Sequence, residues 1–270
     1  MVGALHRKIM KDFRTYVLVG GMPQSVIAYA EGQNFEAADL AKRRILRLYH
    51  EDIHKYAGGA DEKVTAVFDG IPGQLGKVNK RFMLASVVDG ARGRDFVEVF
   101  DWLKESMIVN LCYNNSDPNA ALGLSEKGSE MKCYLCDTGL LVTQAFQNKR
   151  FLDNAIYRNV LLDKLDINEG MIMENYVAQA LRMGGYGLYY YAHNNEETKK
   201  LDMEVDFLIV QDGKVNPIEV KSGAYRGHSS LDEFKMKFGK RVGKRYVLHT
   251  KDYAEDGDVT YLPLYMAGLL

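Results

Sequence analysis

The sequence contains no long apolar run. Among its 270 residues, no stretch reaches the roughly 18 consecutive apolar residues that a membrane-spanning helix requires. The N-terminus also lacks the apolar core of a secretory signal. These two absences argue against a helical membrane protein and against a secreted one. We therefore expect a soluble protein in the cytoplasm, with no membrane among its partners.

Cysteine is also scarce. The chain has three cysteines, Cys112, Cys133 and Cys136, and the last two form a Cys-x-x-Cys pair. A structural zinc site needs four ligands, which usually come from a second such pair or from two histidines at a set spacing. Because no second pair exists, we predict that the cysteines are buried strand residues rather than zinc ligands.

The chain has almost no net charge, because 35 Lys and Arg residues balance 36 Asp and Glu residues. This balance hides one local excess of positive charge. Six basic residues follow one another with no acidic residue among them: Lys235, Lys237, Lys240, Arg241, Lys244 and Arg245. Such a stretch would attract a DNA backbone. The alternative is a solvated helix end, where cations complement the helix dipole.

A complete phosphate-binding loop is missing. The segment from Gly70 to Val78 is similar to a P-loop, but Ile71 stands where the motif needs glycine. Val78 stands where the motif needs serine or threonine, and no hydrophobic strand leads into the segment. We therefore expect no nucleotide on this chain and no ATPase activity from it alone.

The segment His50–His54 satisfies the H-E-x-x-H pattern of zinc metalloproteases and lies in a stretch, 39–56, that the pattern predicts to be helical. Arg43 and Arg47 share the helix face of the two histidines and would repel a divalent cation. The glycine and histidine that continue the metzincin motif are absent. A zinc metalloprotease is therefore a third hypothesis, beside a solvent-facing helix.

Two β-rich runs near the C-terminus, Glu204–Val210 and Val215–Lys221, carry the clearest chemistry. The linker between them contains Asp212-Gly213. Asp-Gly between two such runs is typical of a two-residue type I′ turn, which pairs the flanking residues Gln211 and Lys214. The sequence therefore predicts a β-hairpin with a defined register.

The predicted register brings two carboxylates together. It places Asp206 opposite Glu219 in a non-hydrogen-bonded pair, where the Cα atoms are about 4.5 Å apart. Two facing carboxylates repel each other unless a cation lies between them, and oxygen ligands favour Mg²⁺ or Mn²⁺. Lys221 would share their face. The alternative is an ion pair between Glu204 and Lys221 beside two solvated carboxylates.

The spacing Asp…Glu-x-Lys on consecutive strands resembles the PD-(D/E)xK nuclease superfamily, with Val205 in place of the proline. The resemblance implies an αβββαβ core over residues 170–265. The local patterns supply elements in that order. Around the hairpin we expect helix Met171–Met183, strand Gly187–Tyr191, helix Ser230–Phe238 and strand Arg245–Thr250.

The same resemblance implies roles for individual residues. Asp206 and Glu219 would bind Mg²⁺, and Glu174, on the first helix, would assist as a third acidic group. Glu204 is the alternative third acid. Lys221 would orient or deprotonate the attacking water, while the ion lowers the pKa of that water and stabilises charge on the phosphodiester.

The N-terminal and middle sections are predicted to be mainly helical. Residues 12–56 form helices around Gly20–Pro23, and 64–110 show two or three further helical patterns. Short, turn-rich strands follow over 111–141. Helices followed by a small β-ribbon suggest a winged helix, which binds either DNA or protein. Its candidate DNA contacts are Lys77, Lys80, Arg81, Arg92 and Arg94.

Six short pieces in sequence order extend the resemblance to nearly the whole chain. They are similar to the uncharacterised C-terminal region of prokaryotic AAA-type ATPases. That family carries a P-loop ATPase module ahead of a winged helix and a nuclease-like domain. The module is absent here, so we expect a truncated gene or a separate chain that supplies the motor. The pieces are 20–23, 49–55, 71–75, 102–105, 132–141 and 174–177.

The sequence therefore predicts an α/β, multi-domain chain: a helical region over 1–60 that resembles the end of an AAA lid, a winged-helix-like domain over 61–145, and a PD-(D/E)xK nuclease-like domain over 146–270. The first hypothesis is a DNA-associated part of an AAA-type ATPase with a Mg²⁺-dependent nuclease-like site. The second is a non-catalytic module that binds DNA or protein. Nothing in the sequence indicates an oligomeric state.

Overall fold

The structure is a computed structural model that describes residues 3–146, 154–155, 157, 169–195, 197–198, 201–223 and 227–270. The chain divides into two compact units. The helical unit comprises Lys11–Asn110 and Cys133–Tyr176, and the sheet unit comprises Met1–Met10, Leu111–Lys132 and Val177–Leu270. Most of 146–168, the first part of the predicted nuclease-like domain, lies outside the described residues.

Helices account for most of the helical unit, as the apolar periodicity predicts. The helices expected around Gly20–Pro23 are confirmed, and α3 begins after Asn34, whose side chain accepts hydrogen bonds from the amides of residues 36 and 37. The helices are α1 (His6–Val19), α2 (Pro23–Ala30), α3 (Phe35–Tyr56), α4 (Asp61–Leu75), α5 (Val97–Glu105) and α6 (Thr138–Ala145). Short 3₁₀ turns at Leu84–Ser86 and Gly93–Phe96 join α4 to α5.

The segment that is similar to a P-loop is helical for most of its length. Residues 70–75 belong to α4, with Pro72 inside the helix. Ile71 and Leu75 are fully buried. A phosphate-binding loop needs exposed backbone N–H groups that precede a helix, so this segment serves the core of the helical unit.

One strand prediction is wrong. The predicted strand region extends to Leu141, but Thr138–Ala145 forms helix α6. Asp137 caps this helix, since its carboxylate accepts a hydrogen bond from the backbone N–H of Leu140 at 2.8 Å. The same carboxylate accepts from the N–H of Gly21 at 2.6 Å. The cap overrides the β-propensity of the apolar run.

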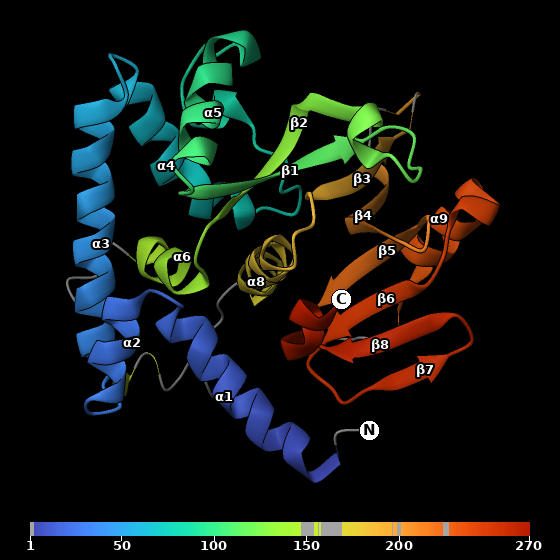
Figure 1. The fold of residues 1–270 in the computed structure, drawn as a ribbon. Coiled ribbons are helices and arrows are strands. Elements are labelled where there is room, and N and C mark those ends of the chain that lie inside the picture. Colours follow the sequence, from blue (N-terminus) through green and yellow to red (C-terminus); the bar gives the residue numbers. More distant parts are fainter. Residues whose placement is uncertain are drawn as a thin grey trace. The chain divides into compact units, whose positions relative to one another are not determined.

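The sheet unit is built on a mixed sheet, in which the described strands run in the order β2-β1-β3-β4-β5-β6-β8-β7 (Figure 1). The β3–β4 and β4–β5 pairs are antiparallel, whereas the β5–β6, β6–β8 and β1–β3 pairs are parallel. The strands are β1 (Val109–Asn115), β2 (Glu126–Leu135), β3 (Tyr189–Asn194), β4 (Leu201–Gln211), β5 (Lys214–Lys221), β6 (Arg245–His249), β7 (Ala254–Asp256) and β8 (Val259–Pro263).

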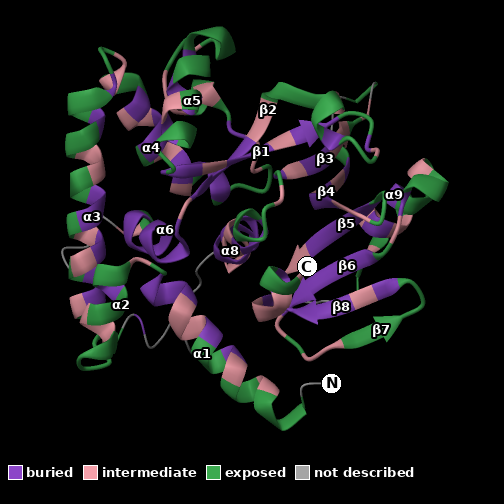
Figure 2. Ribbon diagram, viewed as in Figure 1, coloured by how far each residue is buried: buried purple, intermediate pink, exposed green. Residues whose placement is uncertain are grey.

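The predicted elements around the hairpin are confirmed. Helix α8 (Glu169–Met183) precedes β3, and α9 (Ser229–Phe238) connects β5 to β6. Leu231 and Phe234 of α9 are fully buried and pack with Val205 and Val247 of the sheet in one core cluster. Figure 2 shows the buried residues concentrated along β5, β6 and β8, with the edge strand β7 exposed.

The predicted β-ribbon extends the sheet. Tyr113 of β1 pairs with Tyr189 of β3, so most of the ribbon belongs to the sheet unit, while α4 and α5 belong to the helical unit. Cys112 and Cys133 are buried in β1 and β2, as predicted, whereas Cys136 lies just after the end of β2 and is only partly buried. The fold is mixed α/β. No helix within the described ranges is both long enough and apolar enough to cross a membrane.

Candidate functional site

The β4–β5 hairpin has the predicted turn and register. Asp212 and Gly213 have φ values of 53° and 70°, the positive values that a type I′ turn requires at both positions. Gln211 pairs with Lys214, and the ladder continues to Phe207 and Ile218. The hairpin prediction is confirmed as far as this pair.

The ladder ends one position before the two acidic residues. Tyr189 of β3 pairs with Leu208, whereas Tyr191 pairs with Val205, so two residues of β4, Asp206 and Phe207, lie opposite one residue of β3. This is a β-bulge, which changes the direction of the bulged side chains. It interrupts the alternation that the sequence argument assumed.

The side chains of Asp206 and Glu219 extend from opposite faces of the sheet. Glu219 is in register with Val247, which lies with Val205 in the core beside α9. Because neighbouring residues of a strand alternate between faces, Glu219 extends from the α9 face and Asp206 from the other. The prediction that the two carboxylates face each other is therefore wrong.

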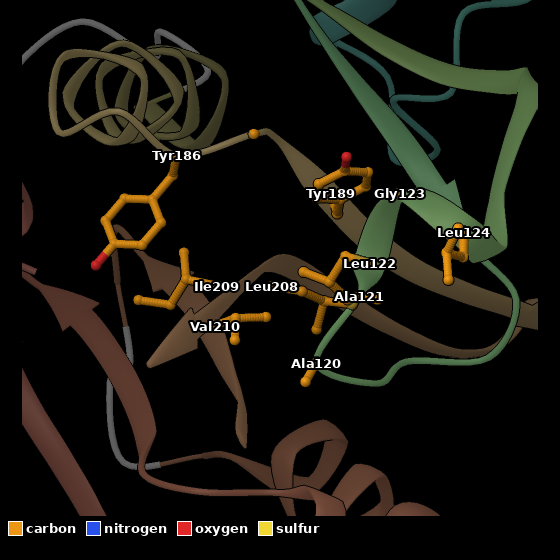
Figure 3. A pocket seen from close by; sticks show the side chains of 11 residues that line it. Ala120, Ala121, Leu122, Gly123, Leu124, Tyr186, Tyr189, Leu208, Ile209 and Val210 are labelled. Carbon is orange, nitrogen blue, oxygen red and sulfur yellow. The ribbon is translucent and has the colours of Figure 1, made fainter. Parts of the chain in front are cut away.

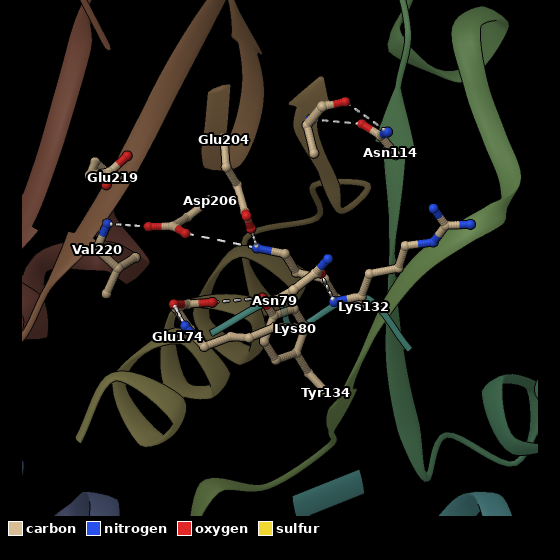
Figure 4. A network of polar contacts seen from close by, with 12 residues as sticks. Asn79, Lys80, Asn114, Lys132, Tyr134, Glu174, Glu204, Asp206, Glu219 and Val220 are labelled. Carbon is tan, nitrogen blue, oxygen red and sulfur yellow. Dashed lines mark hydrogen bonds and ion pairs between the residues drawn. The ribbon is translucent and has the colours of Figure 1, made fainter. Parts of the chain in front are cut away.

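Asp206 turns toward the backbone of β5 instead. Its Oδ2 accepts a hydrogen bond from the N–H of Val220 at 2.8 Å (Figure 4). Val220 is the residue between Glu219 and Lys221. The two acids and the lysine are thus grouped around one residue of β5, although they approach it from different sides.

Lys221 forms its ion pair within its own strand. Its Nζ lies 2.7 Å from Oε1 of Glu219, two residues earlier on the same face. The alternative pair between Glu204 and Lys221 does not form. Glu204 pairs with Lys132 of β2, with 2.6 Å between Nζ and Oε1.

Lys132 is a site residue that the sequence argument missed. Its side chain is 1% exposed, and its Nζ also lies 3.8 Å from Oδ1 of Asp206 (Figure 4). The ammonium lies 4.9 Å from the ring centre of Tyr190. One signal was available in the sequence, because Lys132 is a single cation directly before the apolar run Cys133–Leu135.

A buried histidine adjoins Lys221 in the sheet. His249 pairs with Lys221 in the parallel β5–β6 ladder and is fully buried. Its burial, and then the positive charges of His6 and Lys251, lower the pKa of His249 to about 4. The ring is therefore neutral at pH 7, and its Nδ1 accepts a hydrogen bond from the N–H of Lys251 at 2.9 Å.

Glu174 belongs to the helical unit and has partners there. Its Oε1 pairs with the ammonium of Lys80, and its Oε2 accepts a hydrogen bond from the hydroxyl of Tyr134 at 3.2 Å (Figure 4). The side chain is 5% exposed. Lys80, a candidate DNA contact of the predicted winged helix, is thus used in a buried ion pair.

The donor set of the hairpin fits Mg²⁺ in chemistry. Asp206 and Glu219 supply carboxylate oxygens, and Mg²⁺ is commonly held by one or two carboxylates with water completing the shell. Within the described ranges, no three His, Cys, Asp or Glu side chains come close enough together to hold a metal ion. A resident ion would therefore depend on these two side chains and on water.

The basic stretch after α9 is mostly used in ion pairs. Arg245 is buried, with Nη2 at 2.5 Å from Oδ1 of Asp258, and it also pairs with Asp232. Hydrogen bonds from Arg245 and then from Lys235 hold the pKa of Asp258 well below its usual range.

Some of the remaining basic residues contact a carboxylate or an aromatic ring, and others form no ion pair among the described residues. Arg241 pairs with Asp117 at 2.6 Å, and the Lys237 ammonium lies 5.4 Å from the ring centre of Tyr191. Among the residues that the structure describes, Lys240 and Lys244 form no ion pair. Lys244 lines an open hollow of about 620 Å³ together with Lys214 at the end of the hairpin.

The two histidines of the H-E-x-x-H segment do not converge on a common point. His50 Nε2 lies 3.2 Å from Asp69, and His54 Nδ1 lies 3.0 Å from Asp61. Both aspartates belong to α4. Each imidazole thus has its own carboxylate partner, which favours the interpretation as a helix surface over a zinc site.

A separate cavity of about 380 Å³ lies in the sheet unit. Figure 3 shows its apolar lining, which includes Leu122, Leu208 and Val210, and the ring of Tyr189 at its side. None of the predicted site residues lines it. The cavity therefore has no part in the hairpin chemistry.

Comparison with known families gives two matches. Residues 10–150 match the family described as "Domain of unknown function (DUF8612)". Because this match covers more than half of the 270 residues, the chain belongs to that family. Residues 169–266 match "Domain of unknown function (DUF4143)", a domain typical of AAA-ATPase-associated proteins. No curated protein and no solved structure matches the chain.

Proposed function

We propose that this chain is a DNA-associated C-terminal region of an AAA-type ATPase whose sheet unit is a PD-(D/E)xK nuclease-like domain that hydrolyses phosphodiesters with Mg²⁺ or Mn²⁺. One observation carries the proposal. Asp206 accepts a hydrogen bond from Val220, the residue between Glu219 and Lys221. The residue types that such a nuclease needs are therefore grouped at one point of β5.

The order of elements supports the same proposal. Helix α8, strands β3, β4 and β5, helix α9 and strand β6 follow one another as αβββαβ. Their pairings are antiparallel, antiparallel and parallel. The second family match adds the association with AAA ATPases. The ATPase activity would come from a P-loop module that is not part of this sequence.

The roles of the residues follow from their contacts. Asp206 would ligate the ion, and Glu219, which extends from the other face and pairs with Lys221, would have to rotate away from that lysine to join it. The chemistry of the ion is to activate a water and to stabilise charge on the phosphodiester. While Lys221 donates to Glu219, its ammonium has no lone pair. It would therefore orient the attacking water and stabilise negative charge, rather than accept the proton of that water.

DNA would bind to the chain through two lysines without an ion pair, Lys240 and Lys244. Lys240 and Lys244 form no ion pair among the described residues, so they would remain available for phosphate contacts, whereas their neighbours Arg241 and Arg245 are paired with carboxylates. Phosphate contacts of this kind fix position without reading sequence. The affinity for DNA should therefore fall steeply with salt and depend little on sequence.

The direct test is a cleavage assay with single-stranded, duplex and branched DNA, with and without Mg²⁺. Cleavage should require the ion and should fall about 100-fold or more in Asp206→Asn. The matched control is Asp212→Asn, which removes a carboxylate from the same hairpin and keeps a residue that tolerates positive φ. Full activity in the double variant Asp206→Asn, Lys221→Ala would reject the site.

A second candidate function is a non-catalytic module that binds DNA or a protein partner of the ATPase. The observation that favours it is the pairing of Glu204 and Glu219 with lysine amines. Carboxylates in such pairs can be structural. DNA binding that needs neither Mg²⁺ nor Asp206, without cleavage of any substrate, would favour this module over the nuclease.

A further inference from the structure

The open hollow of about 620 Å³ lies at the turn end of the β4–β5 hairpin, away from the end that carries Glu219 and Lys221. Its lining comes from the turn, from the first residues of β5 and from the segment that leads into β6. Strand β6 is the neighbour of β5 in the sheet (Figure 1). A volume of this size is within the range of ligand sites in proteins.

Three charged side chains line the hollow: Lys214, Lys244 and Asp212. Among the residues that the structure describes, neither lysine forms an ion pair, and both lysines are exposed. The nearby cations Arg241 and Arg245 are instead paired with carboxylates. Two ammonium groups and one carboxylate therefore leave the hollow with one net positive charge.

The backbone around Gly243 holds the two lysines next to the same hollow. Val242 forms a parallel bridge with Val215, and the N–H of Gly243 donates to the carbonyl of Val215 at 2.9 Å. A Cβ at Gly243 would lie 3.1 Å from the Cβ of Lys214. Residue 243 thus packs against the stem of Lys214, and Lys244 follows directly after it.

Hydrogen bonds hold the polar part of the lining in place. Asn216 is only 4% exposed, and its Nδ2 donates to Oε1 of Gln211 at 3.1 Å. The hydroxyl of Tyr246 donates to the same oxygen at 3.2 Å. Nε2 of Gln211 donates in turn to the hydroxyl of Tyr186 at 3.1 Å. Because these side chains are already fixed, a ligand would not have to order them, which lowers the cost of binding.

The charge of the hollow matches one internal phosphate of DNA. A phosphodiester carries one negative charge, whereas a terminal phosphate carries about two. Lysine binds phosphate as a point charge. We propose that the hollow binds one phosphodiester of a DNA strand between Lys214 and Lys244. The inference rests on the proposed association with DNA, and it adds Lys214, which lies outside the basic stretch 235–245, to the DNA contacts.

The test is a pair of single variants and their double variant in a DNA-binding assay. Fluorescence anisotropy gives the affinity of the full chain for a labelled duplex at several salt concentrations. Lys214→Met and Lys244→Met should each reduce the slope of log affinity against log salt by about 1, because the loss of either ammonium leaves the hollow without net charge. The double variant should also lose about 1, since both lysines contact the same phosphate. A loss of about 2 would indicate two separate phosphate contacts and would overturn the inference.

Three controls separate a shaped hollow from surface charge. Lys214→Arg keeps the cation and should keep the wild-type slope. Lys251→Met removes an exposed lysine of the sheet unit outside the hollow and should also leave the slope unchanged. Gly243→Ala keeps every charge, but its Cβ would overlap with Oδ1 of Asn216, so it should weaken DNA binding several-fold. Wild-type affinity in Gly243→Ala would overturn the inference. If circular dichroism shows that this variant is unfolded, the lysine variants decide by themselves.

Two duplexes of one sequence, with 5′-hydroxyl and with 5′-phosphate ends, identify the phosphate that is bound. Equal losses of affinity in Lys214→Met on both duplexes support an internal phosphodiester. A loss on the phosphorylated duplex alone would point to a terminal phosphate and overturn the inference. An unchanged slope in Lys214→Met would also overturn it, while leaving the association with DNA in place. No DNA binding by the wild type would reject the proposed association with DNA, and the inference with it.

Discussion

The wild-type protein should gain stability, relative to a Lys42→Met variant, as the pH rises from about 8 to about 9.5. Lys42 is fully buried in α3 of the helical unit. Its Nζ donates hydrogen bonds to the carbonyl of Leu18 at 2.6 Å and to the hydroxyl of Tyr157 at 3.2 Å. Burial lowers the pKa of Lys42 from 10.5 to about 8, although Asp39 raises it.

The direction of this pH dependence follows from the number of protons that Lys42 binds in the folded and unfolded states. Between its folded pKa of about 8 and its unfolded pKa of 10.5, Lys42 binds fewer protons in the folded state than in the unfolded state. The free energy of unfolding therefore rises with pH in this window, and the gain is lost as the pH falls through the folded value. Each pH unit inside the window contributes up to about 1.4 kcal/mol, so an interval of about 1.5 units contributes roughly 2 kcal/mol.

The assay is urea unfolding, followed by circular dichroism at several pH values across the window. Lys42→Arg is the matched control, because a guanidinium stays charged and does not titrate below about pH 12. The free energy of unfolding of the wild type, minus that of either variant, should rise by about 2 kcal/mol. A difference that stays constant within about 0.5 kcal/mol would refute the reasoning.

Three further predictions concern packing, acid stability and DNA. Gly139→Ala should lower the free energy of unfolding by about 1–3 kcal/mol in a denaturant titration, because a Cβ would lie 2.6 Å from the backbone of Gly20. Arg245 lowers the pKa of Asp258 in the folded state, so the wild type should lose stability as the pH falls below about 4 and this carboxylate takes up a proton. In acid unfolding curves, Arg245→Met should lose less stability over the same pH range. Lys244→Ala should weaken DNA binding and reduce the slope of log affinity against log salt by about 1.

Each of these has a control. Gly128→Ala meets open space and should leave the free energy of unfolding nearly unchanged, so a comparable loss there would count against the packing argument. For the DNA prediction, the control is Lys55→Ala, which removes a lysine of the helical unit and should leave the slope of log DNA affinity against log salt unchanged. Equal acid sensitivity in Arg245→Met and wild type would contradict the role assigned to the Arg245 ion pairs.

Local patterns predicted the hairpin well, because its determinants are adjacent in sequence. Asp212 and Gly213 both adopt positive φ, and few residue pairs other than Asp-Gly do so at low cost. Caps act at the same short range: Asp137 could have predicted the start of α6, but the apolar run after it was interpreted as a strand.

Contacts between distant segments could not be predicted in this way. Lys132 meets Glu204 across many intervening residues, and a single sequence contains no signal for that pairing. Arg245 was assigned to DNA from its basic neighbours, yet it is buried against Asp232 and Asp258. Composition along the chain cannot tell a solvated cation from one neutralised by a folded carboxylate.

The sequence by itself determined the turn, the order of helices and strands around it, and the presence of two acids and a lysine on adjacent strands. Only the tertiary structure decided where these side chains point. The bulge opposite Tyr190 turns Asp206 away from Glu219, and the buried Lys132 holds it there. The physical reason is that alternation along a strand is a local rule, whereas bulges and buried ion pairs depend on which strands become neighbours in the sheet.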